Sequence, residues 1–330
     1  MPHSTELPAG TIEATFNHVP ALKDGEPERL FHPKTVGYRR YKFEPQTELV
    51  TDMRGHEDEY NVDVHGFQLC KAAPIPEEVY SDDAKFRDQG YAEVKELLKK
   101  TYVQQYCHLF DTVFTHTFHS TGATHVHIFS HIIRKEAHQK VLDIPKETAD
   151  DEECALQTPA MIAHVGKNPP SDNLTNPLRE CGADRERIQD QSYEGAEQVI
   201  TDIPEAPQLA SKANTRWGII NVWRPLKPIT REPLAVCGAR SVPDSDLQQC
   251  WIHVQRPKDG KDDATIDVGL WYLQKGEGHK WYWPSEMQTD EALLIKCFDT
   301  KKDGTARRAP HSALQTPGDH GPPRESVEVR

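Results

Sequence analysis

The chain lacks the long apolar runs and the cationic excess that characterise membrane-spanning and nucleic-acid-binding proteins. No window of its 330 residues approaches the roughly 18 apolar residues that a membrane-spanning helix requires. Its 39 Lys and Arg residues stand against 52 Asp and Glu residues, a formal net charge of -13, whereas nucleic-acid binding relies on cationic contacts with phosphate. The first residues have neither a basic flank nor an apolar core, so no signal peptide is predicted.

The chain is also poor in paired cysteines and in nucleotide-binding motifs. Its seven cysteines are widely spaced and include no Cys-x-x-Cys pair, which indicates a reducing compartment with thiols buried as small apolar residues. No P-loop, Rossmann fingerprint or internal repeat is present. We therefore expect a cytoplasmic protein with a small-molecule substrate and neither nucleic acid nor membrane as a partner. The sequence does not indicate the oligomeric state.

Short runs of β-branched and aromatic residues, separated by turns, dominate the second half of the chain. We expect strands at residues 216–223, 233–237, 249–255, 267–274 and 290–298. From Glu77 to about Gln104 the apolar residues fall at helical spacing. The fold is predicted to be mainly β, a sandwich or barrel with flanking helices, in one domain of residues 1–330. Residues 1–50 are predicted to be an extended N-terminal arm with one or two strands.

One segment has the pattern of an interrupted strand. Residues 160–165 and 190–196 flank 24 residues, Gly166–Gln189, that are polar and rich in Pro and Asn. Joined across this insertion, the flanks read His-Val-Asp-Gln-Ser-Tyr-Glu-Gly-Ala. His164 and Asp190 would then lie two residues apart on an extended strand, with their side chains on one face.

Three residues nearer the C-terminus complete a candidate site. His311 would join His164 and Asp190 as a facial triad of two histidines and one carboxylate, which leaves three positions on ferrous iron for a bidentate cosubstrate and dioxygen. The planar guanidinium of Arg324 would pair with the distal carboxylate of a 2-oxo acid, helped by the hydroxyl of Ser326. This ordered set predicts a non-haem iron centre.

Several segments carry a likeness to a known family. They are Asp52–Tyr60, Asn221–Leu226, Pro233–Cys237 with Ala239–Val242, Asp290–Asp299, Ala309–Ala313 and Pro323–Ser326. In these segments the chain resembles the AsaB-type hydroxylase/desaturase family, which includes the fungal gibberellin desaturase and the CmcJ-type cephem enzymes. The resemblance covers most of the chain, from Asp52 onward.

The resemblance implies a double-stranded β-helix (jelly-roll) oxygenase of fungal secondary metabolism. Such an enzyme uses Fe(II) and the cosubstrate 2-oxoglutarate to hydroxylate or desaturate a small molecule. Carried over by position, the iron ligands are His164, Asp190 and His311, and Arg324 is the cosubstrate anchor. No catalytic residue is implied beyond the metal ligands.

The substrate pocket is predicted less directly. By the same resemblance, Asn221 and Arg224 would line it, although Arg224 could equally be a structural ion-pair partner. Trp223, Trp281 and Trp283 are candidate pocket walls by their aromatic character, and each could instead belong to the core.

Two departures from the family pattern bear on activity. Gly238 stands where an Asp is expected, and Gly166, two residues after His164, cannot ligate a metal. The codons of Gly166 and Lys167 can together contain the splice-donor sequence GT-AAG. Removing the 3 × 24 = 72 bases that encode Gly166–Gln189 would keep the reading frame and rebuild the sequence His-Val-Asp. The insertion Gly166–Gln189 is thus either a retained intron or a genuine surface loop, which loop-closure entropy permits at small cost.

Two other functions stay open at this stage. Separation of His164 from Asp190 would suit a catalytically impaired β-barrel that binds a small molecule or a partner. The histidines between His116 and His131 could instead hold zinc for a hydrolase or an isomerase, although no carboxylate interleaves them.

Overall fold

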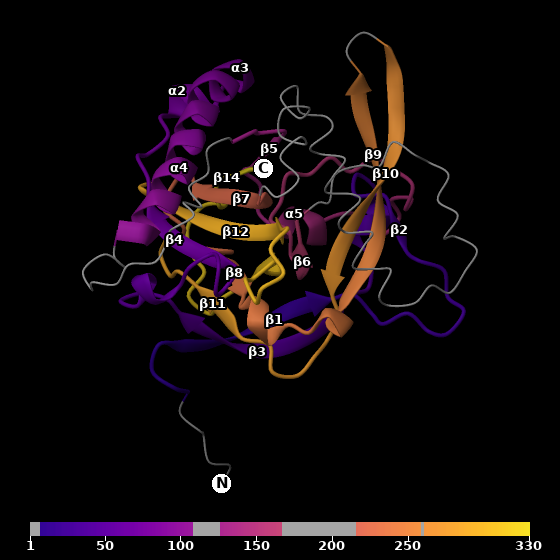
Figure 1. Ribbon diagram of the computed structural model, residues 1–330. Helices are drawn as coiled ribbons and strands as arrows, with labels where there is room; N and C mark the ends of the chain where they lie inside the picture. The colour runs from indigo at the N-terminus through magenta and orange to yellow at the C-terminus, as the bar shows by residue number, and fades with distance from the viewer. Residues whose placement is uncertain (1–6, 108–125, 167–215, 259–260) are drawn as a thin grey trace.

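The computed structural model describes residues 7–107, 126–166, 216–258 and 261–330. In this part of the chain the strands form two sheets (Figure 1). The nine-stranded sheet has the order β1 (Thr11–His18), β3 (Glu44–Asp52), β11 (Trp281–Trp283), β8 (Leu234–Cys237), β13 (His311–Ala313), β6 (His164–Val165), β10 (Lys261–Leu273), β9 (Leu247–Lys258) and β2 (Leu30–Phe31). The five-stranded sheet has the order β4 (Phe67–Lys71), β12 (Glu291–Asp299), β7 (Gly218–Pro225), β14 (Ser326–Val329) and β5 (His131–Arg134).

Helices cover the outer side of the five-stranded sheet. α2, α3 and α4 lie along that side in Figure 1. Among the described residues the helices are α1 (Val36–Arg39), α2 (Glu77–Tyr80), α3 (Asp83–Lys85), α4 (Tyr91–Cys107) and α5 (Gln139–Leu142), with a π-helical turn at Phe86–Gly90 and 3-10 turns at Glu57–Glu59, Ala239–Ser241 and Asp244–Asp246. None of the described helices is long and apolar enough to cross a membrane.

The two faces of the five-stranded sheet bury different cores because successive strand residues point to opposite sides. On the inner face, Trp223 and Ile295 pack with Val236 of the nine-stranded sheet. On the outer face, Val222 and Val327 pack with residues of α2 and α4. This arrangement of two sheets around one interior, with helices outside, is a jelly roll and confirms the predicted fold class.

Strands from the first 52 residues belong to the nine-stranded sheet. β1 pairs antiparallel with β3 along its whole length, from Thr11 opposite Thr51 to His18 opposite Glu44. Phe16 of β1 stacks on Trp281 of β11 with ring centroids 3.8 Å apart. The segment predicted as an extended arm therefore contributes core residues to the sheet.

Most of the predicted elements are confirmed. The five strands expected from the β-branched and aromatic runs are observed as β7, β8, β9, β10 and β12. The helix expected from Glu77 to about Gln104 is present but divided. Asp82 causes one break, because its side chain accepts hydrogen bonds from the backbone N–H groups of Ala84 and Lys85 and so begins a new helix at Asp83.

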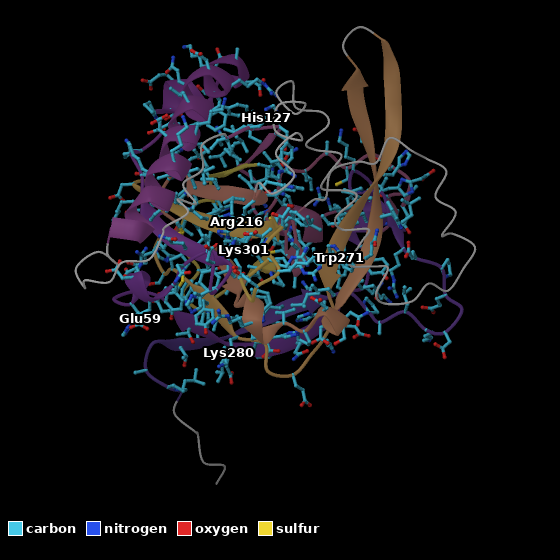
Figure 2. The ribbon with its side chains drawn as sticks, viewed as in Figure 1. Glu59, His127, Arg216, Trp271, Lys280 and Lys301 are labelled. Carbon is cyan, nitrogen blue, oxygen red and sulfur yellow. The ribbon has the colours of Figure 1, made fainter. Side chains whose placement is uncertain are left out.

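A buried charge cluster ties β12 to the loops around it. The ammonium of Lys296, on a fully buried side chain, lies 2.7 Å from both Asp63 and Asp299. Arg216, labelled in Figure 2, contacts the same two carboxylates. Burial lowers the pKa of Arg216, but its hydrogen bonds to Asp299 and Asp63 outweigh burial and raise that pKa above its ordinary value.

Candidate metal centre

His164 and His311 lie side by side at the centre of the nine-stranded sheet. β6 and β13 are antiparallel neighbours, and these two residues are directly paired. Directly paired residues project from the same face of a sheet. The two imidazole rings have centroids 4.6 Å apart, with an angle of 50° between their planes. The structure thus brings together two of the three predicted iron ligands, which are 147 positions apart in the sequence (311 − 164).

Backbone carbonyls determine which nitrogen of each ring is protonated. His164 Nδ1 lies 2.8 Å from the carbonyl oxygen of Ile162, and His311 Nδ1 lies 3.2 Å from that of Ala309. Because a carbonyl oxygen can only accept, each Nδ1 carries the hydrogen and each Nε2 presents a lone pair. His311 Nε2 is buried and has no hydrogen-bond partner in the described part of the chain.

Burial keeps both imidazoles neutral. It is the main cause that lowers the pKa of His164 to about 3, and the neighbouring His311 lowers it further. Burial also lowers the pKa of His311. Neutral imidazole is the form that ligates metals, so two neutral nitrogens held by backbone carbonyls suit a metal ion.

The third predicted ligand, Asp190, lies outside the described residues, as do residues 167–189 of the insertion. Gly166 occupies the position two after His164 and has no side chain to offer. A Cβ built on Gly166 would lie 2.6 Å from Cys297 Sγ and 2.7 Å from Asn221 Nδ2, so these two side chains close the space beside it. Among the described residues no group of three His, Cys, Asp or Glu side chains could hold a metal.

Arg324 and Ser326 lie at the start of β14 and face the interior. The Arg324 side chain is buried: Nη1 donates to the carbonyl oxygen of Glu232 at 2.6 Å, and the guanidinium lies 5.2 Å from the centre of the Trp223 ring. Arg324 Nε and Ser326 Oγ are buried and have no hydrogen-bond partner among the described residues. Burial, followed by the charge of Arg134, lowers the pKa of Arg324 to about 9. Unpartnered donors on a buried cation suit an anionic ligand such as a carboxylate.

Glu232, which holds Arg324, was not expected from the sequence. Its side chain is fully buried, and its carboxylate accepts a hydrogen bond from the backbone N–H of His138 at 3.0 Å. Its backbone has a φ of 48°, a left-handed conformation that is uncommon for a residue with a side chain. Nothing in the surrounding sequence Thr-Arg-Glu-Pro predicts this role.

The three predicted pocket residues on β7 separate by strand face. Trp223 lies beneath Arg324, and Asn221 Nδ2 is 3.4 Å from the buried carboxylate of Glu328, so both face the interior. Arg224 points to the opposite face, where its guanidinium contacts Glu93 of α4 at 3.4 Å and the carbonyl of Ala73. The structure does not bring Arg224 to the histidine pair. Glu328 itself was not expected from the sequence.

The remaining candidates occupy structural positions where they are described. Trp281 is part of the core through its stacking on Phe16, and Trp283 packs against the same core. His131 contacts Tyr91 at 3.0 Å and Asp83 at 3.3 Å on the helical side of the molecule. His116, His119 and His125 lie outside the described residues.

Gly238 has room for a larger side chain. A Cβ on Gly238 would be 3.4 Å from a ring carbon of Tyr282, an ordinary contact. Space therefore does not explain the absence of Asp at this position.

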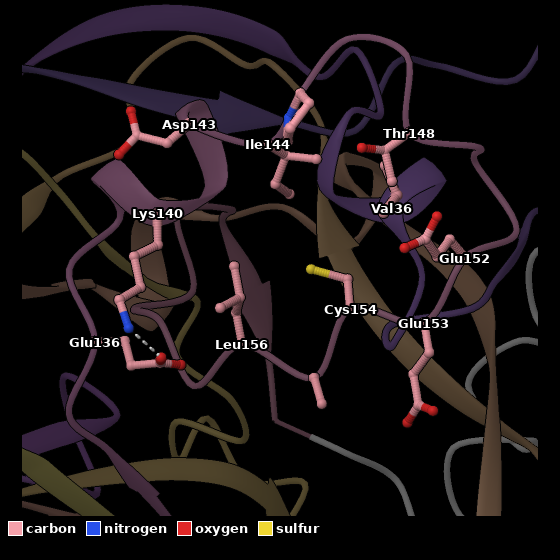
Figure 3. A pocket seen from close by; sticks show the side chains of 12 residues that line it. Val36, Glu136, Lys140, Asp143, Ile144, Thr148, Glu152, Glu153, Cys154 and Leu156 are labelled. Atoms are coloured by element: carbon pink, nitrogen blue, oxygen red, sulfur yellow. Dashed lines mark hydrogen bonds and ion pairs between the residues drawn. The ribbon is translucent and has the colours of Figure 1, made fainter.

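A surface cavity of about 700 Å³ lies away from these residues (Figure 3). Its lining comes from α1, α5 and the segment that follows α5, and includes the Lys140–Glu136 ion pair at 2.7 Å. None of the predicted site residues lines it.

Comparison with known proteins identifies the family. Residues 16–119 and 115–330 match the family model described as an oxidoreductase/YMDC permease-like domain. The chain is 36% identical to the hydroxylase/desaturase efuI of Hormonema carpetanum over 97% of this chain and 94% of efuI. It is 45% identical to the hydroxylase/desaturase asaB of Aspergillus flavus, over 40% of this chain and 61% of asaB.

A solved structure shares the fold. The iron and alpha-ketoglutarate-dependent endoperoxidase NvfI matches with a TM-score of 0.62 and 22% identity, over 98% of this chain and 97% of NvfI. The likeness to NvfI is a likeness of the fold. The chain belongs to the hydroxylase/desaturase family of efuI and asaB, an oxidoreductase family, which confirms the resemblance seen in its motifs.

Proposed function

We propose that the chain is an Fe(II)/2-oxoglutarate-dependent oxygenase that hydroxylates or desaturates a small molecule in fungal secondary metabolism. Its iron ligands are His164, Asp190 and His311. The main support is the buried Nε2 of His311, which has no partner in the part of the chain that the structure describes and lies beside the neutral imidazole of His164. Family membership and the NvfI fold agree with this assignment.

Each residue of the site has a defined part in this proposal. The carbonyls of Ile162 and Ala309 hold the two imidazoles with Nε2 toward the metal. Asp190 adds the carboxylate that completes a facial triad. When bound, ferrous iron with dioxygen and a 2-oxo acid supplies the oxidising power for attack on a C–H bond.

The same proposal assigns the cosubstrate site. Arg324 and Ser326 bind the distal carboxylate of 2-oxoglutarate, which provides acceptors for donors that are otherwise unsatisfied. Trp223 covers one face of the guanidinium and keeps water from it. Asn221 faces the same interior and is a candidate substrate contact. The dispersed thiols support a cytoplasmic location.

The insertion gives rise to a second candidate function. Cys297 and Asn221 close the space beside Gly166, where a ligand two residues after His164 would stand. A chain that retains Gly166–Gln189 as a loop could therefore be a β-barrel binding module with impaired catalysis. We favour the retained intron, and we treat residues 1–330 as one domain with this insertion. Sequencing of cDNA tests the retained-intron hypothesis. If most transcripts encode Gly166–Gln189, the hypothesis is wrong.

Anaerobic titration with Fe(II) tests the metal site of the chain as it exists. We expect one iron per chain, and we expect His311→Ala to weaken binding by at least about 100-fold, the upper end of the loss seen when a residue supporting a ligand is removed. His320→Ala is the matched control, because His320 is exposed. Absence of binding by the unaltered chain would favour the binding module.

Metal analysis tests the zinc alternative. Stoichiometric zinc that survives His311→Ala would overturn our assignment and favour a zinc site among the histidines from His116 to His131.

A further inference from the structure

Arg134 ends β5 at the edge of the five-stranded sheet, next to the proposed cosubstrate site. It pairs directly with Ser326 of β14. Side chains of directly opposed residues in an antiparallel pair lie about 4.5–5.5 Å apart at Cβ, on the same face. Arg134 therefore shares the inner face with Ser326 and Glu328.

Arg134 has no carboxylate partner among the described residues. Its Nη1 donates to the carbonyl oxygen of Thr158 at 2.9 Å. Arg324 likewise binds a backbone carbonyl, that of Glu232. Two guanidinium groups thus lie beside Ser326, and each donates to a neutral backbone carbonyl.

The carboxylates that act on these arginines are engaged elsewhere. Glu328 contacts Arg330 at 3.4 Å and Asn221 at 3.4 Å. The carboxylate of Glu232 accepts from the backbone N–H of His138. Asp319 accepts from the backbone N–H of Glu232 and from the hydroxyl of Thr316.

The charges of Arg134 and Arg324 act on each other. After burial, the charge of Arg134 is the largest cause that lowers the pKa of Arg324. Two like charges that repel in a partly desolvated site favour an anion between them. A carboxylate offers about four lone-pair sites, enough for two guanidinium groups and a hydroxyl.

We infer that Arg134 is a second binding residue for the distal carboxylate of the cosubstrate, acting with Arg324 and Ser326. The inference rests on the proposed function and extends it from one anchor to a two-arginine site. It also assigns a residue of β5, outside the motifs that carry the family resemblance, to ligand binding.

Calorimetric titration of the full chain, loaded with Fe(II) under anaerobic conditions, tests this assignment. The two ligands are 2-oxoglutarate and 2-oxopentanoate, which has the same carbon chain without the distal carboxylate. We expect Arg134→Gln to weaken the binding of 2-oxoglutarate by about tenfold or more, because one charge-assisted hydrogen bond is lost. Binding of 2-oxopentanoate is expected to stay unchanged.

Arg307→Gln is the matched control. Arg307 is also partly buried and donates to a backbone carbonyl, that of Asp299 at 2.9 Å. We expect this variant to bind both ligands as the unaltered chain does. If the Arg134→Gln variant does not fold, the Arg134→Lys variant is used instead, because lysine keeps the positive charge and lacks the planar guanidinium. A several-fold loss for 2-oxoglutarate alone is then expected.

Three results would contradict the inference, and one of them concerns the proposed function. If the unaltered chain does not bind 2-oxoglutarate, the proposed function fails and the inference fails with it. If the unaltered chain binds 2-oxoglutarate, and a folded Arg134 variant binds it equally well, only the inference is overturned. Equal weakening of both ligands would overturn the placement of Arg134 at the distal carboxylate.

Discussion

At the scale of single residues, the candidate centre depends on hydrogen bonds that leave the right atoms free. The carbonyls of Ile162 and Ala309 take the Nδ1 hydrogens of the histidine pair, so that Nε2 of each ring points elsewhere. The carbonyl of Glu232 accepts one hydrogen of Arg324, whose Nε has no partner within the described ranges. Backbone acceptors thus orient the ligating groups without neutralising the charge that a cosubstrate would meet.

Arg324→Lys tests the anchor at this scale. A lysine ammonium cannot contact the carbonyl of Glu232 and also present a planar fork to a carboxylate. We expect the KM for 2-oxoglutarate to rise by about tenfold or more, with kcat little changed, because the lost contact is made in the ground state and the transition state alike. The measurement is the dependence of turnover on 2-oxoglutarate concentration.

Arg231→Lys provides the control for this change. Arg231 also donates to a backbone carbonyl, that of Gly321 at 3.2 Å, in an exposed contact. An unchanged KM in Arg324→Lys, or an equal rise in Arg231→Lys, would contradict the role of Arg324.

Glu291 links stability to pH through its ion pairs with Arg54 and, on the exposed side, Lys71. Arg54 binds its carboxylate through both Nη atoms, at 2.7 and 2.8 Å. Burial raises the pKa of Glu291, but the hydrogen bonds from Arg54, helped by those from the Gln288 backbone N–H and Lys71, outweigh burial and hold that pKa at about 2. Because this pKa is lower in the folded state, the pair stabilises fully above the ordinary pKa of 4.5 and loses its effect as pH falls toward 2.

Glu291→Gln is therefore expected to lower the free energy of unfolding at pH 7 by roughly 1–3 kcal/mol. The difference from the unaltered chain should shrink as pH falls below about 4.5. Urea unfolding at a series of pH values measures both effects. A difference that stays constant from pH 7 to pH 3 would show that the ion pair is not its cause.

At the scale of elements, the fully buried Lys296 joins β12 to Asp63. Removing its charge leaves two carboxylates with Arg216 as their remaining cationic partner. We expect Lys296→Met to destabilise the protein by about 3 kcal/mol, the lower end of the cost of breaking a buried pair. Urea unfolding at neutral pH is the measurement.

Lys301→Met is the matched control for Lys296→Met. Lys301 pairs with Asp303 at 2.9 Å, and both side chains are exposed. An exposed pair contributes about 1 kcal/mol at most. Equal destabilisation by the two substitutions would contradict the structural role of the buried cluster.

Local sequence patterns predicted most of the strands, but they did not predict which strands pair with each other. Short runs of apolar, β-branched and aromatic residues predicted β7 and β12, which are strands buried on both faces of the sheet. The direct pairing of His311 with His164 is a contact between distant segments, and no local pattern encodes it. The order of the motifs suggested that these histidines act together, and the register of β6 and β13 provides the geometry.

It was harder to predict on which face of a strand a polar residue lies. Asn221 and Arg224 stand three positions apart on β7, so period two puts them on opposite faces. Sequence alone did not indicate which face is the interior, and Arg224 lies on the helical side with Glu93. Arg134 and Glu328 escaped notice for a related reason, since a charged residue on an edge or terminal strand resembles a solvated one.

At the scale of the whole molecule, the charge distribution is uneven. The chain has a formal net charge of -13, yet the interior around the histidine pair contains Arg134, Arg324 and Arg330. Only Arg330 of these has a carboxylate partner among the described residues. Such an interior would attract a dicarboxylate cosubstrate into a protein whose exterior is acidic.

In our proposal the insertion decides whether this architecture is active. The jelly roll contains the histidine pair and the side chains of Arg134 and Arg324, while Asp190 stands 24 residues after Gly166 in the sequence. If Gly166–Gln189 is a retained intron, its removal returns a carboxylate to the position two after His164. The side chains of Asn221 and Cys297 would then have to move, because they approach a Cβ at that position to 2.7 and 2.6 Å.

Release of succinate from 2-oxoglutarate, measured side by side for the chain as it stands and for a version lacking Gly166–Gln189, tests the account most directly. We expect iron-dependent release from the shortened version at a rate well above that of the full chain. His311→Ala in the shortened version should abolish it. No succinate from either version, or release that survives His311→Ala, would contradict the proposed iron centre.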